Sequence, residues 1–120
     1  MAIGPQARQR LADLEVLQNR IQHLHGLVER FVAERNDPDQ HIAALRRSLV
    51  RMKTELTGAG LDAMAQVCAS LEIVAKRSGS KPFKGRVLRE GIASLRLQLE
   101  IEQRLTRTAG EPADRPEAKE

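Results

Sequence analysis

Few side chains in this sequence have the chemistry of a catalyst or a metal ligand, and their spacing brings none of them together. The three histidines are His23, His25 and His41. The first two stand two positions apart, so on a helix they point to different faces and do not form the i, i+4 pair of a helical metal site. The single cysteine, Cys68, lies on an apolar stripe with no histidine or cation placed to activate it, so we expect a buried and inert thiol. No glycine-rich phosphate loop, carboxylate pair or catalytic triad spacing is visible. The sequence therefore predicts no metal site, no cofactor, no small-molecule substrate and no enzymatic activity.

A valine surrounded by basic residues is a stronger candidate, as a surface for binding another protein. The apolar residues around it recur at intervals of three and four, which marks the core side of a helix. Val50 is about 100° round this helix from Leu49, at the edge of the apolar stripe. Its neighbours one turn away are three cations and a threonine, so we expect Val50 to be at least partly exposed. Such a surface suits a partner with an acidic rim and an apolar centre. The residues of this candidate docking face are Arg46, Arg47, Val50, Lys53, Thr54 and Thr57.

The docking face needs a helix that is packed on its other side, and four amphipathic segments can supply that packing. The first runs over about residues 6–34. The second begins at Pro38, with Asp37 as its N-cap and Gln40 completing a capping box. It ends at Gly60, because glycine can adopt the left-handed conformation that stops a helix. The predicted buried stripes are Leu14, Leu17, Ile21, Leu24, Val28 and Phe31 in the first helix, and Ile42, Leu45, Leu49, Met52 and Leu56 in the second.

Two further helices are predicted by the same spacing. The fourth starts near residues 80–82 and runs to about Thr106. Residues 95–101 also alternate with period two, as a strand would, but a lone strand has no partner in this chain, so we keep the helical interpretation. Gly85 and Gly91 are expected to be weak points of this helix, each costing roughly 1 kcal/mol relative to alanine. The stripes are Leu61, Met64, Cys68, Leu71 and Ala75 in the third helix, widened by Val67 and Val74, and Leu88, Ile92, Leu95 and Leu99 in the fourth.

Composition favours an all-α fold of one domain. The chain has 120 residues, of which only 2% are aromatic, whereas the good helix formers Leu, Ala, Glu, Arg and Gln dominate. Four helices with short connections predict an antiparallel four-helix bundle with a long N-terminal helix. We expect a flexible N-terminus over residues 1–5, a single domain over 6–107, and a disordered tail over 108–120, where prolines and charges concentrate.

Charge, cysteine content and hydropathy limit the cellular locations and the classes of partner that we expect for this protein. The net charge of +4 would serve either nucleic acid or an acidic protein face, but the aromatic platforms that stack single-stranded nucleic acid are missing. No apolar run approaches the roughly 18 residues of a membrane-spanning helix. The first residues carry no signal-peptide pattern, and one cysteine fits a reducing compartment. The expectation is a cytoplasmic protein without a membrane span.

The stretch Ala44-Leu-Arg-Arg-Ser-Leu-Val50-Arg-Met-Lys53-Thr54, followed by Gly60 and then by Cys68-Ala-Ser-Leu71-Glu72, carries a recognisable pattern. It resembles the central hairpin of a histidine phosphotransfer (HPt) domain. In that family the pattern is roughly Ala-Leu-x-x-x-Ala-His-x-Leu-Lys-Gly, five residues, Gly, and often Cys-x-x-Leu-Glu. Lys53 and Gly60 keep their expected offsets, whereas Val50 stands where the phosphorylatable histidine is expected and Thr54 replaces a glycine. The resemblance covers about residues 42–72.

The resemblance implies an HPt-like bundle in two-component signalling, whose docking face meets the receiver domain of a response regulator or a histidine kinase. Valine has no nitrogen lone pair, so position 50 cannot carry a phosphoryl group, and we expect a non-catalytic adaptor of a phosphorelay. A fainter resemblance, of His41 and the residues after it to a kinase phosphoacceptor box, lacks the acidic residue after the histidine.

Two other classes of function stay open. A self-associating helical module, such as a homodimer, would follow if the regular stripe of the first helix extended into a second chain. Nucleic-acid binding is the weaker possibility, suggested by the basic charge. The basic segment 76–86 would suit contacts to phosphates or acidic lipids, or would be a solvated connection.

Overall fold

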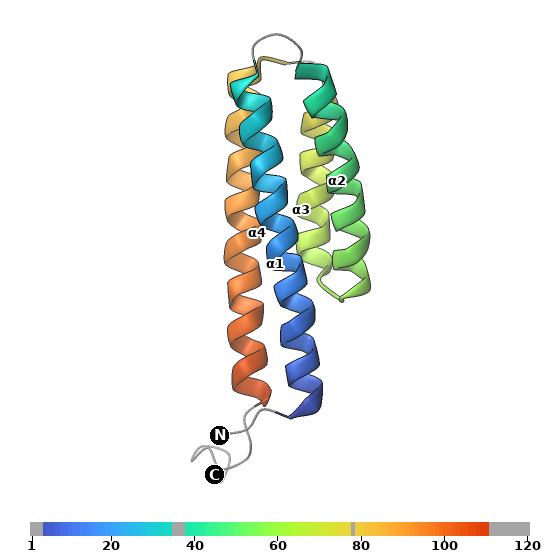
Figure 1. Cartoon of the computed structure of the whole chain (residues 1–120), viewed down its shortest axis with the longest axis vertical. Coiled ribbons are helices and arrows are strands. Elements are labelled where there is room, and N and C mark those ends of the chain that lie inside the picture. Colours follow the sequence, from blue (N-terminus) through green and yellow to red (C-terminus); the bar gives the residue numbers. More distant parts are fainter. Residues whose placement is uncertain (1–3, 35–37, 78, 111–120) are drawn as a thin grey trace.

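Four α-helices form the part of the chain that the computed structural model describes, which is residues 4–34, 38–77 and 79–110. They are α1 (Pro5–Ala33), α2 (Pro38–Gly58), α3 (Asp62–Lys76) and α4 (Lys81–Gly110). α1 packs against α2 and α4, and α3 packs against the same two helices, so successive helices run antiparallel around one core (Figure 1). The predicted all-α, antiparallel four-helix bundle is confirmed. None of these helices combines the length and the hydropathy needed to cross a bilayer.

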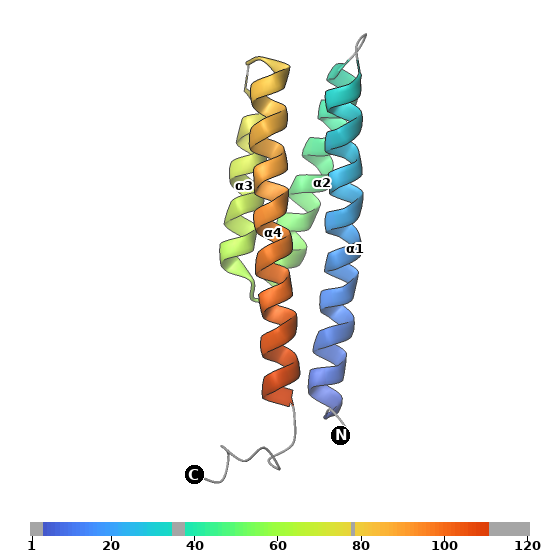
Figure 2. The same cartoon turned by 90° about the vertical axis from the view of Figure 1, so that its left-hand side faces the viewer.

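The first and last helices, α1 and α4, are longer than the two helices of the hairpin between them. α1 and α4 contain 29 and 30 residues, whereas α2 and α3 contain 21 and 15. Both long helices therefore continue past the turn that joins α2 to α3 (Figures 1 and 2). Arg10 closes the bundle beneath this turn, because its Nη1 donates a hydrogen bond of 2.8 Å to the carbonyl of Ala59 and its Nη2 lies 4.0 Å from Glu102 Oε1.

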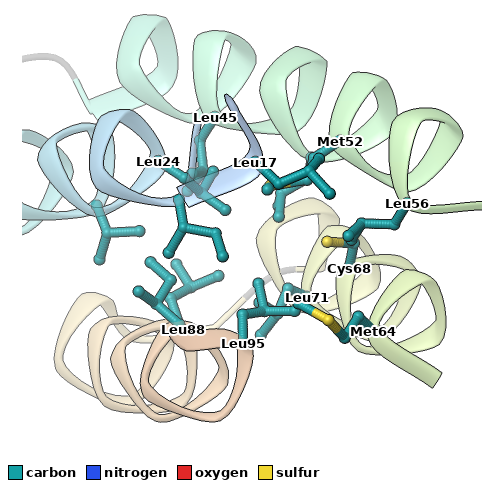
Figure 3. Packing of buried hydrophobic residues seen from close by; sticks show 14 of the residues in the cluster. Leu17, Leu24, Leu45, Met52, Leu56, Met64, Cys68, Leu71, Leu88 and Leu95 are labelled. Atoms are coloured by element: carbon teal, nitrogen blue, oxygen red, sulfur yellow. The ribbon is translucent and has the colours of Figure 1, made fainter. Parts of the chain in front are cut away.

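The core is aliphatic and is built from the predicted stripes. All predicted stripe residues are buried except Ile42, Val67 and Val74, which are half-buried at its edge. Side chains from all four helices meet in the middle of the bundle (Figure 3). Leu27 and Ala65 are also buried, beyond the prediction. Among the described residues no polar or charged side chain is buried, so within the core only the shapes of apolar side chains align the helices.

The end of α2 fixes the hairpin that carries the docking face. Gly60 has a φ of +78°, the left-handed conformation predicted for it. Its N–H donates to the carbonyl of Thr57 over 3.0 Å, and the N–H of Leu61 donates to the carbonyl of Leu56 over 2.9 Å. This is the paired hydrogen-bond pattern of a Schellman motif, in which the hydrophobic residues Leu56 and Leu61 are both buried.

Several helix boundaries differ from the predicted ones. α4 continues to Gly110, so the predicted tail boundary at 108 is wrong by three residues, while 111–120 lie outside the described residues. Pro5, predicted to be flexible, is the first residue of α1, and residues 1–3 lie outside the described part. Pro38 begins α2 as predicted, although the proposed cap at Asp37 is not among the described residues.

Gly85 and Gly91, in the interior of α4, are positions of close contact with neighbouring helices. A Cβ atom on Gly91 would lie 2.5 Å from Leu71 Cδ2, and one on Gly85 would lie 2.8 Å from Val32 Cγ2. Both distances are shorter than a carbon–carbon contact allows, so glycine lets α4 approach α3 at one position and α1 at the other. The predicted propensity cost stays a prediction, and the structure adds that a methyl group fits at either place only if the neighbouring side chain shifts.

Candidate functional site

Val50 lies on the outer side of α2, opposite the core residues Leu45, Met52 and Leu56 that Figure 3 shows pointing inward. Its side chain is 48% exposed, which confirms the predicted partial exposure. The other five residues of the docking face share this side, with Arg46 half-buried and the rest exposed. The helix thus holds an apolar point within a ring of cations, as the spacing predicted, while the binding role of these residues stays a prediction.

One cation of the docking face is paired with an acidic residue and two are not. On the edge toward α3, Arg46 Nη2 lies 3.7 Å from Glu72 Oε2, which offsets its charge. A shallow hollow of about 460 Å³ lies between α2 and α3 here and includes Val50 in its lining. Arg47, on the edge toward α1, and Lys53, seven residues after Arg46 and on the same edge as Arg46, have no acidic partner among the described residues. The unpaired positive charge is therefore what an acidic partner would meet.

Arg51 is a member of this surface that the sequence reasoning missed. It lines the hollow beside Val50 and also a groove of about 680 Å³ between α1 and α2. Arg47 and His23 share that groove, and Val16 contributes an apolar side chain to it. Arg51 follows Arg47 by four residues, so their spacing was the available signal that two cations lie on one side of α2.

The two threonines of the docking face present little hydrogen-bonding capacity. Thr54 Oγ1 donates to the carbonyl of Val50 over 3.2 Å, and Thr57 Oγ1 donates to the carbonyl of Lys53 over 2.9 Å. Each hydroxyl proton is thereby turned back onto α2, a common behaviour of threonine inside helices. These positions add methyl groups and acceptor lone pairs to the surface, so cationic side chains supply its donors.

The histidines do not form a site. His23 lies in the α1–α2 groove, whereas His41 Nε2 lies 3.3 Å from Glu34 Oε2, at the end of the bundle where α1 stops and α2 begins. Among the residues that the structure describes, no three or more potential metal ligands cluster. Cys68 is fully buried, and desolvation raises the pKa of its thiol to about 12. The predicted buried thiol is confirmed.

The basic segment 76–86 has a structural use for two of its lysines. Lys81 Nζ donates to the carbonyl of Glu34, just after α1, and Lys84 Nζ donates to the carbonyl of Ala75 over 3.4 Å, at the end of α3. Cations at helix C-termini are favourable because the last carbonyls lack partners within the helix and carry partial negative charge. Part of this segment therefore caps the neighbouring helices.

Comparison of the chain with protein-family models, with curated proteins and with solved structures finds no match in any of the three. The bundle topology is shared by many unrelated proteins and assigns no function by itself. The docking face and the motif residues of the sequence are therefore the features of this chain that bear on its function.

Proposed function

We propose that this protein is a non-catalytic, HPt-like signalling protein that binds the receiver domain of a response regulator, or a histidine kinase, through the docking face. One observation carries the proposal: Val50, at the position of the expected histidine, is exposed among cations, and two of these, Arg47 and Lys53, have no acidic partner among the described residues. HPt domains, the family that this sequence resembles, dock onto the phosphorylation site of a receiver domain, and that site is acidic. A cationic ring would attract such a surface over a distance, and the valine would supply apolar contact at its centre.

Position 50 also sets what the protein does once bound. A histidine there would attack the aspartyl phosphate of a receiver through an imidazole nitrogen, form an N–P bond and release the carboxylate. The isopropyl group of Val50 has no such nitrogen, so the complex would occupy the receiver without discharging it. Sequestering a receiver or blocking a relay is the expected consequence. The proposed partner also agrees with the cytoplasmic location that the sequence led us to expect.

Binding to receiver domains encoded in the same genome tests the proposal directly. Each receiver is titrated by isothermal calorimetry, with and without a phosphoryl mimic, at concentrations up to about 50 µM. We expect at least one receiver to bind, with an affinity that falls as salt rises, because the cations of the docking face are exposed. Absence of binding to every receiver and histidine kinase in this range would refute the proposal.

Two charge reversals locate the contact. Lys53→Glu removes an unpaired cation of the docking face and is expected to weaken binding by about tenfold or more. Arg86→Glu makes the same change of charge on the exposed surface of α4 and serves as the matched control. Equal losses for the two variants would mean that the partner senses only net charge, which contradicts a defined face on α2.

Restoring the histidine gives an independent check of the HPt-like geometry. Val50→His changes a half-exposed side chain, so the fold is expected to persist. We expect the variant to take up phosphate from a receiver charged with a small acyl phosphate, whereas His41, paired with Glu34, does not label in the parent chain. A variant that binds the receiver but never becomes phosphorylated would show that position 50 does not face the receiver's aspartate.

A further inference from the structure

The outer face of α4 carries a row of exposed apolar side chains that the bundle does not use. Leu97, Ile101 and Leu105 are 59%, 43% and 57% exposed, and each follows the previous one by four residues. We call these three residues the α4 ridge. Single exposed hydrophobic residues are ordinary on protein surfaces, but adjacent ones on one face indicate an interaction site. The other large exposed apolar residues, on α1, α2, α3 and the start of α4, do not extend this row.

The ridge is exposed along its length, and its first residue faces away from the core. Leu97 is two positions from both Leu95 and Leu99, which are buried, so it lies about 200° round the helix from each of them. Ile101 borders a hollow of about 270 Å³ at the start of α3, where Leu61 and Met64 also contribute. Past this level the hairpin has ended and α4 continues beside α1 (Figure 2). A partner can therefore approach the Leu105 end of the ridge without meeting α3, whereas at Ile101 it also meets the start of α3.

We propose that two copies of this chain associate through the α4 ridge. Residues spaced by four form the i±4n ridge of a helix, and two such ridges pack into each other's grooves at a crossing angle of about −50°. A two-fold axis through Ile101 would place Leu97 opposite the partner's Leu105. It would also place Leu105 opposite the partner's Leu97, so the surface is complementary to itself. Crossed helices touch over a short length, and the ridge runs over nine residues, from Leu97 to Leu105, with a rise of about 12 Å.

The charges beside the ridge favour a second copy over a partner of a single charge sign. Glu100 and Arg104 are both exposed and lie on the same side of the ridge. Neither has an ion-pair partner among the described residues. The same two-fold axis would bring Glu100 near the partner's Arg104 twice. An acidic partner would place a negative charge opposite Glu100, and a basic partner would place a positive charge opposite Arg104. Either arrangement brings like charges together.

The dimer is expected to be weak and to leave the docking face free. Three side chains on crossed helices bury far less than the roughly 1,600 Å² of a standard protein interface, so we expect a dissociation constant of about 10–500 µM. α2 packs against α1 and α3 but not against α4, so the docking face lies across the bundle from the ridge. This association is independent of the proposed function and holds whether or not a receiver binds.

Sedimentation equilibrium of the full chain between about 5 µM and 1 mM tests the dimer. We expect the mean mass to rise from 13.4 kDa toward twice that value across this range. Ile101→Glu is expected to keep the protein monomeric at every concentration. Ile73→Glu is the matched control, because Ile73 on α3 has a similar exposure of 47% and should leave the dimer unchanged. Circular dichroism confirms that both variants are folded.

A charge exchange tests the two-fold arrangement itself. Glu100→Arg alone is expected to weaken the dimer by about tenfold, because it faces the partner's Arg104 with a like charge. Adding Arg104→Glu to this variant restores opposite charges on both sides of the axis and is expected to recover the parent affinity. A protein that stays monomeric at 1 mM, or a dimer that survives Ile101→Glu or is lost equally in Ile73→Glu, would overturn the proposal.

Discussion

Replacing Gly91 with alanine tests whether this glycine is required by packing. In an exposed helix the change would stabilise the fold by about 1 kcal/mol, because alanine loses less conformational freedom than glycine. Here the new methyl group would lie 2.5 Å from Leu71 Cδ2, 2.6 Å from Cδ1 and 2.9 Å from Cγ. Because the Cγ branch point is involved, the whole buried side chain of Leu71 must shift, and such overpacking costs about 1–3 kcal/mol. We therefore expect Gly91→Ala to change stability by between zero and a loss of about 2 kcal/mol.

Gly26 in α1 is the matched control for this substitution. It is also inside a long helix, but a Cβ atom there would meet nothing within 4 Å. Gly26→Ala should therefore gain about 0.5–1 kcal/mol. Urea unfolding followed by far-ultraviolet circular dichroism measures both variants, and the predicted difference between them is about 1–3 kcal/mol. The reasoning is refuted if Gly91→Ala stabilises the protein as much as Gly26→Ala does.

A double-mutant cycle assigns the loss to one contact. Leu71→Ala should cost about 2–5 kcal/mol by leaving a cavity. In that background the methyl group of Gly91→Ala enters the vacated space, so the same substitution should now be stabilising. The expected interaction energy between the two positions is about 1–3 kcal/mol. A value near zero would show that Leu71 does not limit what fits at position 91.

Three further predictions concern single groups. Cys68 should react with a thiol reagent at pH 8 only after unfolding, because burial keeps its thiol protonated; rapid labelling of the native protein would contradict this. Arg89 donates two hydrogen bonds of 2.8 Å to Glu29, which lowers the pKa of that carboxyl below its ordinary 4.5. The resulting stability is present above pH 4.5 and is lost as the pH falls through the folded-state pKa, so Arg89→Gln should lower the melting temperature at pH 7 but not at about pH 2. A deficit that persists at the low pH would assign the effect to packing. Lys81→Met should lower the free energy of unfolding by about 0.5–1 kcal/mol in thermal unfolding, because it removes the cation at the end of α1. Lys53→Met removes no such contact and should lower it hardly at all. Equal losses for the two variants would show that Lys81 does not cap α1.

The buried side of each helix was predictable because apolar residues must recur with the helical period if they are to share one core. The residue at which α4 ends was not predictable from the sequence. The residues between Thr106 and Gly110 are compatible with a helix, and the first proline after them is Pro112. The contacts of Gly91 were hidden for a different reason. Helical spacing tells which face of α4 is buried, but not which side chain of another helix comes closest to it.

The period-two alternation near the end of the chain has a helical origin. Leu95 and Leu99 belong to the core stripe, whereas Leu97 and Ile101 belong to the α4 ridge. Two rows, each with a spacing of four and offset by two, together look like a strand. The helical interpretation is therefore confirmed, and the exposed row itself was the signal for a second surface.

The docking face was predicted only as far as one helix determines it. The exposure of Val50 follows from its angle to Leu49 on the same helix, and the structure agrees. The pairing of Arg46 with Glu72 and the groove that includes Arg51 depend on α3 and α1 lying beside α2. Local spacing therefore predicted which residues are outside, whereas the charge left unpaired required the packed helices.

The aliphatic core leaves open how this bundle selects one alignment of its helices from several similar ones. Leucine stripes tolerate a translation by one turn, about 5.4 Å, because the same kind of side chain returns to each place. Among the described residues no hydrogen-bonded group in the core penalises such a slip. The glycine contacts supply the penalty instead: sliding α4 by one turn would bring Leu88 or Leu95 toward Leu71, where the native alignment has only a hydrogen atom. In this protein two missing side chains would oppose such a slip within the core, as a buried polar pair does in other bundles.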